Sequence, residues 1–451
     1  MNALVLRSTR VVTPNGTAAH AILVQDGRIV DVADHGAMLP GATVVDEGDA
    51  VVMSGLVDTH VHINEPGRTE WEGFATATRA AAAGGVTTLL DMPLNSIPAT
   101  TSTAALEAKR AAASGQCWVD VGFLGGVVPG NAIALHGLSV AGVLGFKCFL
   151  VPSGVPEFRH VGERDLRAAL PMLARLGTTL MVHAELPGPI ADAPPIRDPP
   201  SYGDYLASRP RAAEEEAIAL VLRLVEECGA RVHIVHLSSS DALPLLVAAR
   251  ARGVSVTVET CPHYLHFAAE DIPDGATEFK CAPPIRERSN REALWHALDA
   301  GAIDLIVSDH SPCPPAMKHR ESGDFTAAWG GIASLQLGLS IIWKGMRARD
   351  IPFERLATWM SEAPARLAGL SRRKGSIAVG RDADFVVWRP ERWFTVRAES
   401  LLHRYPVTPY LGARLPGVVE ATYLRGERIF ERGAVGAPAR GTLLARELRD
   451  R

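Results

Sequence analysis

Residues 55–67, GLVDTHVHINEPG, contain the first decisive pattern of the chain. The stretch starts with the apolar residues of a buried strand, reaches His60 and His62, and then turns at once into Asn, Glu, Pro and Gly. Side chains two residues apart on a strand point to the same face of the sheet. The two histidines are therefore placed either to share a metal ion or to serve as ordinary polar residues at the end of a strand.

Seven further strand-like apolar runs follow, and Ala-rich or amphipathic segments typical of helices separate most of them. The runs lie at 86–92, 118–127, 143–150, 179–185, 231–238, 255–261 and 303–310. Eight alternating units predict a (β/α)8 TIM-type barrel, an α/β fold whose buried parallel strands are almost continuously apolar. A doubly wound open sheet is the structural alternative, but no GxGxxG motif follows the first run.

The two ends of the chain have a different pattern. In the first 50 residues short apolar runs alternate with hairpin signals such as Asn15-Gly16 and Asp26-Gly27, and 375–391 and 418–433 repeat this style. Neither end is long enough to form a sheet core alone, so we expect both to pack into one small, discontinuous β-sandwich domain. The predicted boundaries are 1–54 and 371–451 for this domain and 55–370 for the barrel.

Composition excludes several classes of protein. The 451 residues carry a formal net charge of −4 and show no basic stripe, so nucleic acid is not an expected partner. The sequence contains no apolar run of about 18 residues, the length that a membrane span needs. The first residues lack the apolar core of a signal peptide. Six cysteines without CxxC spacing predict neither disulfides nor a zinc knuckle, and a cytoplasmic location is expected.

Polar residues lie near the ends of the predicted barrel strands, where the catalytic groups of such barrels gather. The candidates are His60, His62, Lys147, His183, His236 and Asp309. A single histidine in such a place is more often structural, but polar residues in the same place on several strands favour a metal site. His233 lies three residues before His236 and is expected to face the opposite side.

Lys147 stands inside the apolar run GVLGFKCFLV. Burial of a charged ammonium is costly, and desolvation favours the neutral amine. A neutral amine can take up carbon dioxide to form a carbamate, which is an anionic oxygen ligand for metal ions. The alternative is a lysine at a strand edge whose ammonium reaches water.

The set HxH, Lys, His, His and Asp resembles that of the cyclic amidohydrolases in the amidohydrolase superfamily, which include dihydroorotases, hydantoinases (dihydropyrimidinases) and allantoinases. The resemblance implies a barrel with two divalent metal ions, a bridging carboxylated lysine and a metal-bound hydroxide as nucleophile. The implied ligands are His60, His62 and Asp309 for one metal, His183 and His236 for the other, and N6-carboxylated Lys147 as the bridge. Zn²⁺ suits these ligands, and Co²⁺, Mn²⁺ or Fe²⁺ also fit. The likeness further implies a homotetramer.

Four stretches are similar to those of allantoinases: HVHINEPGRTEWEGF (60–74), DMPLNSIPAT (91–100), GFKCFL (145–150) and HRYPVTPYLGARLPGVVEATYLRG (403–426). Dihydroorotases usually carry a carboxylate-binding arginine at the position of Asn64, and hydantoinases commonly carry a tyrosine shortly after the lysine. The chain has neither residue, which favours a small neutral cyclic ureide as substrate. The alternatives are a hydantoinase or dihydropyrimidinase, and a non-catalytic scaffold with the same fold.

The implied reaction is hydrolysis of the ring amide of allantoin to allantoate. Asp309 is the expected catalytic residue, which takes a proton from the nucleophile and passes it to the leaving nitrogen. Asn64, Asn95 and Ser311 are expected to bind the substrate, although Asn95 could instead cap a turn and Ser311 could bond to nearby backbone. The Pro- and Gly-rich segments 186–204 and 312–330 are either covers of the site or surface connections.

Overall fold

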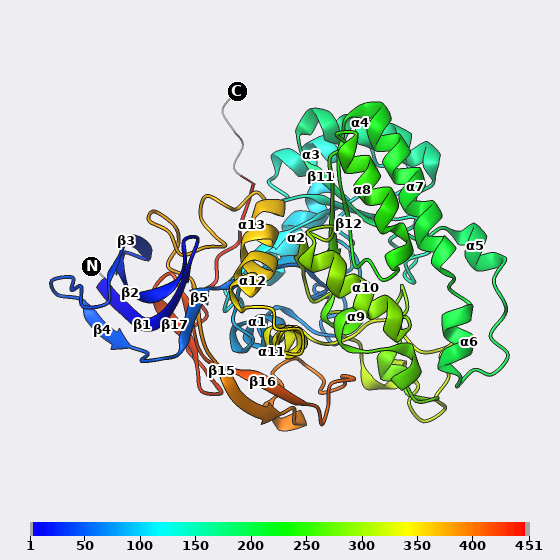
Figure 1. Cartoon of the computed structure of the whole chain (residues 1–451). Coiled ribbons are helices and arrows are strands. Elements are labelled where there is room, and N and C mark those ends of the chain that lie inside the picture. The colour runs from blue at the N-terminus through cyan, green and yellow to red at the C-terminus, as the bar shows by residue number, and fades with distance from the viewer. Residues whose placement is uncertain (1–2, 447–451) are drawn as a thin grey trace.

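The computed structural model describes residues 3–446. Residues 1–2 and 447–451, which the predicted end domain includes, lie outside the described part. Figure 1 shows a large barrel surrounded by helices, with a sheet at one side that contains strands from both ends of the chain. Within residues 3–446, no helix has both the length and the apolar character needed to cross a membrane.

The barrel strands are parallel and follow the order of the chain. They are β6 (Leu56–Val61), β7 (Val86–Asp91), β8 (Asp120–Phe123), β9 (Gly125–Gly126), β10 (Phe146–Phe149), β11 (Thr179–His183), β12 (Arg231–Ile234), β13 (Val256–Thr260) and β14 (Leu305–Ile306). Every residue of β6, β7, β8 and β10 is buried, as expected for strands that are covered on both faces.

Two joints connect the hydrogen-bonded groups β6–β8 and β9–β14 into a closed ring. Val61 forms a parallel bridge with His310, and the backbone N–H of His62 donates to the carbonyl of His310 at 2.8 Å. On the other side, the N–H of Leu144 donates to the carbonyl of Phe123 at 2.9 Å. The predicted (β/α)8 TIM-type barrel is confirmed, although the run 118–127 is divided into two short strands at Leu124.

Helices pack around the barrel, several of them in the Ala-rich or amphipathic segments between the predicted strands (Figure 1). They are α1 (Phe74–Ala83), α2 (Thr103–Ala113), α3 (Ala134–Val140), α4 (Glu163–Leu176), α5 (Pro187–Ala191), α6 (Tyr202–Ala207), α7 (Arg211–Cys228), α8 (Leu243–Ala251), α9 (Pro262–His266), α10 (Arg288–Asp299), α11 (Gly338–Arg347), α12 (Glu354–Ala357) and α13 (Ala363–Leu367). In α4 the buried residues are Leu166, Ala169, Leu170 and Leu173, which is the spacing of one helix face.

The second sheet joins the two ends of the chain, as the sequence predicts. Its strand order is β18-β17-β16-β15-β5-β1-β2-β3, with β4 paired to β1. The strands are β1 (Ala3–Thr13), β2 (Gly16–Gln25), β3 (Arg28–Asp34), β4 (Thr43–Asp46), β5 (Val51–Ser54), β15 (Phe385–Thr395), β16 (Arg414–Leu424), β17 (Glu427–Glu431) and β18 (Ala434–Val435). The fully buried β5 joins the two halves, because it pairs with β1 on one side and with β15 on the other. The domain boundaries 1–54, 55–370 and 371–451 stay a prediction.

The C-terminal segment returns to the barrel beside β8. The N–H of Val121 donates to the carbonyl of Thr442 at 3.0 Å, and the N–H of Leu444 donates back to the carbonyl of Val121 at 2.8 Å. These contacts lie near Asp120, the first residue of β8 and therefore at the N-terminal end of the barrel. The carboxyl ends of the strands, at the opposite mouth, carry the predicted site.

Candidate metal centre

The carboxyl ends of the barrel strands hold all six predicted metal ligands. They are His60 on β6, His62 just after it, Lys147 on β10, His183 at the end of β11, His236 after β12 and Asp309 after β14. Each of these residues is at most 7% exposed. Buried polar groups need hydrogen-bonding or ionic partners. The distances between these six residues show which partners each of them has.

His60, His62 and Asp309 form one group, whose ligand atoms all lie within 4.8 Å of one another. Asp309 Oδ1 is 3.2 Å from Nε2 of His60 and 3.6 Å from Nε2 of His62. Two imidazole nitrogens and one carboxylate oxygen facing a common point are a donor set that suits a divalent metal ion such as Zn²⁺.

His183 and His236 form a neighbouring pair. Their ring centroids are 4.6 Å apart, and the ring of His236 is 5.4 Å from that of His60. No third His, Cys, Asp or Glu of the described chain completes a ligand group with this pair. A second metal ion here would therefore need one more anionic ligand, which the unmodified side chains do not supply.

Lys147 differs from the other buried lysines of residues 3–446, which are Lys109, Lys318 and Lys374. Lys109 Nζ donates to Asp91 at 2.6 Å, Lys318 Nζ to the carbonyl of Trp329 at 3.0 Å, and Lys374 Nζ to Asp120 at 2.6 Å. The Nζ atom of Lys147 is buried and has no hydrogen-bond partner. Of the buried lysines in residues 3–446, Lys147 alone lacks a hydrogen-bond partner, which fits an amine that is completed by further chemistry.

The protonation states of the cluster suit metal binding. Burial lowers the pKa of His62 to about 4 and holds the pKa of His236 well below its usual value. Burial also lowers the pKa of Lys147 to about 8, which makes the neutral amine accessible. Burial alone would raise the pKa of Asp309, but the surrounding imidazoles, that of His60 first, hold it well below its usual range. Near neutral pH the cluster therefore offers neutral imidazoles at His62 and His236 and an ionised carboxylate at Asp309.

Two buried glutamates, which the sequence analysis did not select, orient the histidines. Glu185 Oε2 accepts a hydrogen bond from Nε2 of His183 at 2.6 Å and is itself held by Arg209. Glu259 Oε1 lies 2.5 Å from Nδ1 of His60. Both were detectable from the sequence, since Glu185 shares the strand face of His183 two residues earlier and Glu259 is a charged residue within the apolar run 255–261.

The three predicted substrate contacts have different surroundings. Asn95 and Ser311 line the cavity, whereas Asn64 does not. The Asn95 amide lies 3.4 Å from Nδ1 of His62, and the Ser311 hydroxyl donates to Asp309 Oδ1 at 3.1 Å. Asn64 is fully buried, and its amide donates to the carbonyl of Pro312 at 3.3 Å. That contact connects the turn after β6 to the loop after β14.

Several residues of the cluster have a left-handed backbone. The φ angles are +68° at Asn64, +66° at Asn95, +38° at His236 and +45° at Asp309. This conformation is unfavourable for residues with a Cβ, so it persists only where surrounding contacts require it. The strained positions coincide with the strand ends that carry the polar cluster.

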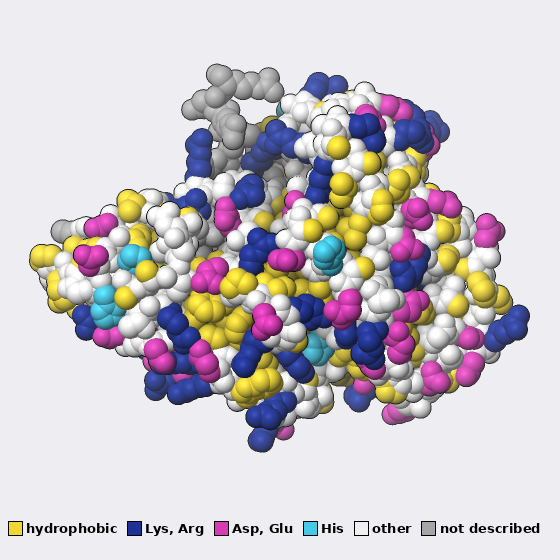
Figure 2. Space-filling view, viewed as in Figure 1, with side chains coloured by type: hydrophobic (Ala, Val, Ile, Leu, Met, Phe, Trp, Pro, Cys, Tyr) yellow, Lys and Arg dark blue, Asp and Glu magenta, His cyan; other side chains and the backbone are white. Residues whose placement is uncertain are grey.

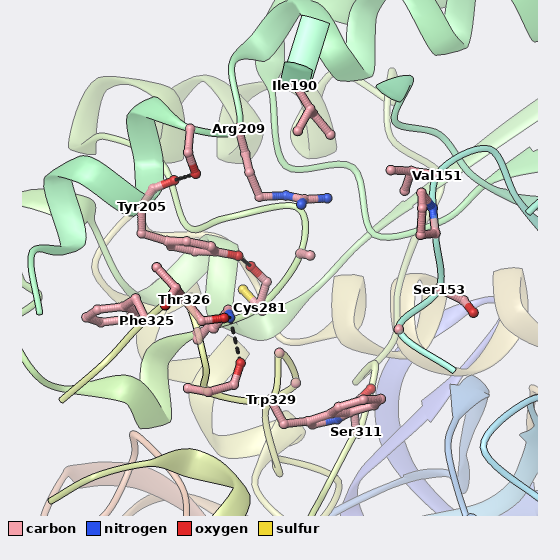
Figure 3. Close-up of a pocket in the computed structure, with 18 of the residues that line it drawn as sticks. Val151, Ser153, Ile190, Tyr205, Arg209, Cys281, Ser311, Phe325, Thr326 and Trp329 are labelled. Carbon is pink, nitrogen blue, oxygen red and sulfur yellow. Dashed lines mark hydrogen bonds between the residues drawn. The ribbon is translucent and has the colours of Figure 1, made fainter. Parts of the chain in front are cut away.

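A cavity of about 930 Å³ opens above the cluster. Figure 3 shows Arg209 and Tyr205 reaching into it from one side, with Ser311 and Trp329 on another. Its size is sufficient for a small-molecule ligand.

On the face seen in Figure 2, acidic and basic side chains are interspersed, with small hydrophobic groups between them.

The two Pro- and Gly-rich segments of the sequence both form walls of this cavity. Ile190 and Pro195 belong to the segment 186–204, and Phe325 and Trp329 belong to the segment 312–330. The N–H of Phe325 donates to the carbonyl of Pro199 at 2.8 Å, so the two segments are bonded to each other. They enclose the site at the mouth of the barrel.

Comparisons with known proteins agree with this geometry. Residues 51–429 match the model of the Amidohydrolase family, and the chain therefore belongs to that family. Enzymes of this family generally depend on two metal ions, in agreement with the candidate ligand groups.

Relatives that match this chain over nearly its full length include several proteins named allantoinase. The chain is 54% identical to the allantoinase of Streptomyces avermitilis, over 98% of this chain and 99% of that one. It is 46% identical to the allantoinase of Arabidopsis thaliana (97% and 90% covered) and 44% identical to that of Saccharomyces cerevisiae (95% and 96%). Among solved structures, the L-hydantoinase of Arthrobacter aurescens is similar, with a TM-score of 0.92, 30% identity and 99% and 100% of the chains covered.

Proposed function

We propose that this chain hydrolyses the ring amide of allantoin to allantoate. The observation that carries the proposal is the convergence of His60, His62 and Asp309 beside a buried lysine amine that has no partner. The relatives named allantoinase, at up to 54% identity, support the choice of substrate. The substrate is then a small cyclic ureide, and water adds across one ring C–N bond to give a single ring-opened product.

The ligand assignment follows the two groups of the cluster. His60, His62 and Asp309 would hold one divalent ion, and His183 and His236 would hold the other. N6-carboxylated Lys147 would supply the anionic ligand that the histidine pair lacks. The buried Nζ, whose pKa is lowered to about 8 by desolvation, supports this role, because only the neutral amine reacts with carbon dioxide.

When bound, the two cations polarise the ring carbonyl and lower the pKa of water, so that a nucleophile is available at neutral pH. Asp309 accepts the proton of the attacking water and transfers it to the leaving ring nitrogen. The hydroxyl of Ser311, 3.1 Å from Asp309 Oδ1, orients this carboxylate. Burial of the whole cluster excludes bulk water and strengthens each electrostatic interaction within it.

Substrate recognition is assigned to Asn95 and Ser311, which line the cavity. An amide and a hydroxyl can match the carbonyl and N–H groups of a neutral ureide. Asn64, predicted as a third contact, is bonded to Pro312 outside the cavity lining, so we assign it the role of holding the loop after β14. Allantoin then meets the neutral side chains of Asn95 and Ser311 near the metal ligands. The cavity lining also contains the cations Arg209, which is paired with Glu185, and Lys280.

Metal identity and assembly extend the same proposal. Zn²⁺ is the proposed metal because imidazole and oxygen ligands suit it, and Co²⁺, Mn²⁺ or Fe²⁺ can satisfy the same donors. A homotetramer is proposed on the likeness to the cyclic amidohydrolases.

A hydantoinase activity is the second candidate, since the similar solved structures include an L-hydantoinase with a TM-score of 0.92. The test is turnover of allantoin, hydantoin, dihydrouracil and dihydroorotate by one preparation whose metal content is measured. Preference for allantoin with about two divalent ions per chain supports the proposal. A clear preference for another ring contradicts the substrate assignment, and a metal-free, inactive preparation that cannot be reloaded favours a scaffold.

A further inference from the structure

We infer that Glu259 and His233 together form a buried positioning unit that holds a ligand from each of the two proposed metal positions, His60 and His236. Neither residue of the unit belongs to the predicted ligand set. The inference rests on the proposed metal centre and adds to it the groups that keep the ligands ready for metal.

Glu259 lies on β13, a strand that contributes no ligand, and its side chain is fully buried. Its Oε1 lies 2.5 Å from Nδ1 of His60 on β6 and accepts the backbone N–H of His236 at 3.2 Å. One carboxylate oxygen thus contacts both the backbone of His236 and the ring of His60. These two ligands belong to β6 and to the turn after β12, two strands that both precede β13 in the chain.

The bond to Glu259 determines which nitrogen of His60 can bind metal. An ionised carboxylate only accepts hydrogen bonds, so Nδ1 of His60 carries the proton that it donates to Oε1. Nε2 is then the ring nitrogen left to face a metal ion, and it lies 3.2 Å from Asp309 Oδ1. A metal ion bound there would take an electron pair from each of these two atoms.

His236 depends on Glu259 in a different way. Its backbone φ is +38°, an unfavourable conformation for a residue with a Cβ, and its N–H is fixed by Glu259. This bond holds the backbone in the conformation that turns the imidazole of His236 towards His183. Loss of the carboxylate would free the backbone at the point where the ligand leaves the strand.

His233 completes the unit from behind. Its Nε2 lies 2.8 Å from Oε2 of Glu259, and its Nδ1 lies 2.8 Å from Oγ1 of Thr257. The two contacts suit one tautomer of His233, in which the Thr257 hydroxyl donates to Nδ1 and the Nε2–H group donates to Glu259. Both oxygens of Glu259 are thereby occupied, and its carboxylate cannot rotate away from His60.

Metal binding by variant proteins tests this inference. Chelator-treated full-length protein is titrated with Co²⁺ against a competing chelator, and the visible absorption of the bound ion is recorded. Wild-type protein should bind about two Co²⁺ per chain. In Glu259→Gln the affinity should fall by about 10–100-fold, with a changed absorption spectrum, because the ligands lose the charge and geometry of the carboxylate.

Two controls separate positioning from general destabilisation. Glu214→Gln alters another buried carboxylate, which pairs with Arg286 at 2.7 Å and accepts the backbone N–H groups of Ser238 and Ser239 but no hydrogen bond from a proposed ligand side chain. This variant should keep the wild-type Co²⁺ affinity within about 3-fold, whatever it does to the melting temperature. His233→Leu should weaken binding by about 10-fold, and His233→Gln, which can still donate to Glu259, should restore most of it.

The outcomes distinguish the two levels of the proposal. If wild-type protein binds no Co²⁺, the proposed metal centre itself is contradicted. If wild-type protein binds two ions and Glu259→Gln binds them with the same affinity and spectrum, the positioning unit is contradicted while the metal centre stands. If Glu259→Gln does not fold, the comparison of His233→Leu with His233→Gln decides, and equal affinities in that pair overturn the inference.

Discussion

Two buried lysines at opposite ends of the barrel show how surroundings decide what a buried charge does. Lys374 Nζ lies 2.6 Å from Asp120, 2.6 Å from Asp384 and 3.0 Å from Asp382. Burial alone would lower its pKa, but these carboxylates raise the pKa above the usual value. Lys147 Nζ has no such partner, and burial lowers its pKa to about 8. One lysine is a permanent cation that joins chain segments, and the other is an amine available for chemistry.

The same comparison distinguishes the proposed metal site from another group of close ligand atoms. Asp120, Asp382 and Asp384 have oxygens as close together as the ligand atoms at the barrel mouth. Their common centre, however, already holds the ammonium of Lys374, and arginines pair with Asp120 and Asp382 as well. At the mouth no protein cation lies between Asp309 and its histidines. Proximity of ligand atoms therefore indicates a metal site only where the protein has not supplied its own counter-charge.

Replacement of Lys147 is expected to have the largest effect. Lys147→Met removes the group that would form the carbamate, so kcat/KM for allantoin should fall about 1,000-fold or more, with loss of bound metal. The melting temperature of metal-free protein should not fall, because an apolar side chain replaces an amine that has no partner. Steady-state kinetics, metal analysis and thermal denaturation check this. Normal turnover by Lys147→Met would refute the carbamate.

Replacement of Lys374 should give the opposite pattern. Lys374→Met leaves buried carboxylates without their cation, and the free energy of unfolding should decrease by about 3–5 kcal/mol. Folded protein at low temperature should nevertheless keep its metal content. Denaturant unfolding and metal analysis of the same preparation measure both quantities. A variant that loses metal but keeps its stability would mean that the roles of the two lysines are reversed.

These two lysines also mark what sequence can and cannot predict. Strand periodicity and the rule for barrel strand ends predicted that six candidate ligands lie at one mouth, and the structure brings them together there: His60, His62, Lys147, His183, His236 and Asp309. The carboxylates that pair with Lys374 are Asp120, 254 residues earlier in the chain, and Asp382 and Asp384, 8 and 10 residues later. No local sequence pattern links these residues to the lysine.

Strand lengths were less accurate than strand positions. The run 303–310 forms regular strand only at Leu305–Ile306, since Asp309 adopts a left-handed backbone and leaves the strand geometry. Glu259 was overlooked although it presents the same signal as Lys147, a charged residue in a buried strand. The contact of Asn64 with Pro312 depends on closure of the barrel between its first and last strands, which no local pattern contains.

Acid should destabilise the metal-free protein through its buried histidines. Burial lowers the pKa of His62, His263 and His403 to about 4, whereas histidines of an unfolded chain have pKa values of about 6.5. Between these values the unfolded chain binds protons that the folded chain does not bind. The free energy of unfolding should therefore decrease as pH falls from about 6.5 to 4, by about 1 kcal/mol or more per histidine.

Denaturant unfolding of metal-free protein at several pH values from 7 to 4.5 measures this dependence. Stability that stays constant or increases as pH falls through this range would contradict the assignment of these histidines as neutral in the folded protein. The Lys374 cluster should contribute no lysine titration here, because its ammonium stays charged over the whole range.

The smallest expected effect concerns substrate contact. Asn95→Ala should raise KM for allantoin about 10-fold through loss of an amide that lines the cavity. Asn64→Ala, its counterpart outside the lining, should leave KM within about 3-fold and lower the free energy of unfolding by about 1 kcal/mol. Kinetics and denaturant unfolding of the pair provide the comparison. A larger rise in KM for Asn64→Ala than for Asn95→Ala would exchange their assigned roles.

Anomalous diffraction from crystals of Zn²⁺-loaded protein tests the central claim most directly. We expect two anomalous peaks at the carboxyl mouth of the barrel, one near His60, His62 and Asp309 and one near His183 and His236. Density for a carboxyl group should extend from Lys147 Nζ between them. Peaks absent from this mouth, or Lys147 unmodified beside a fully loaded site, would contradict the account.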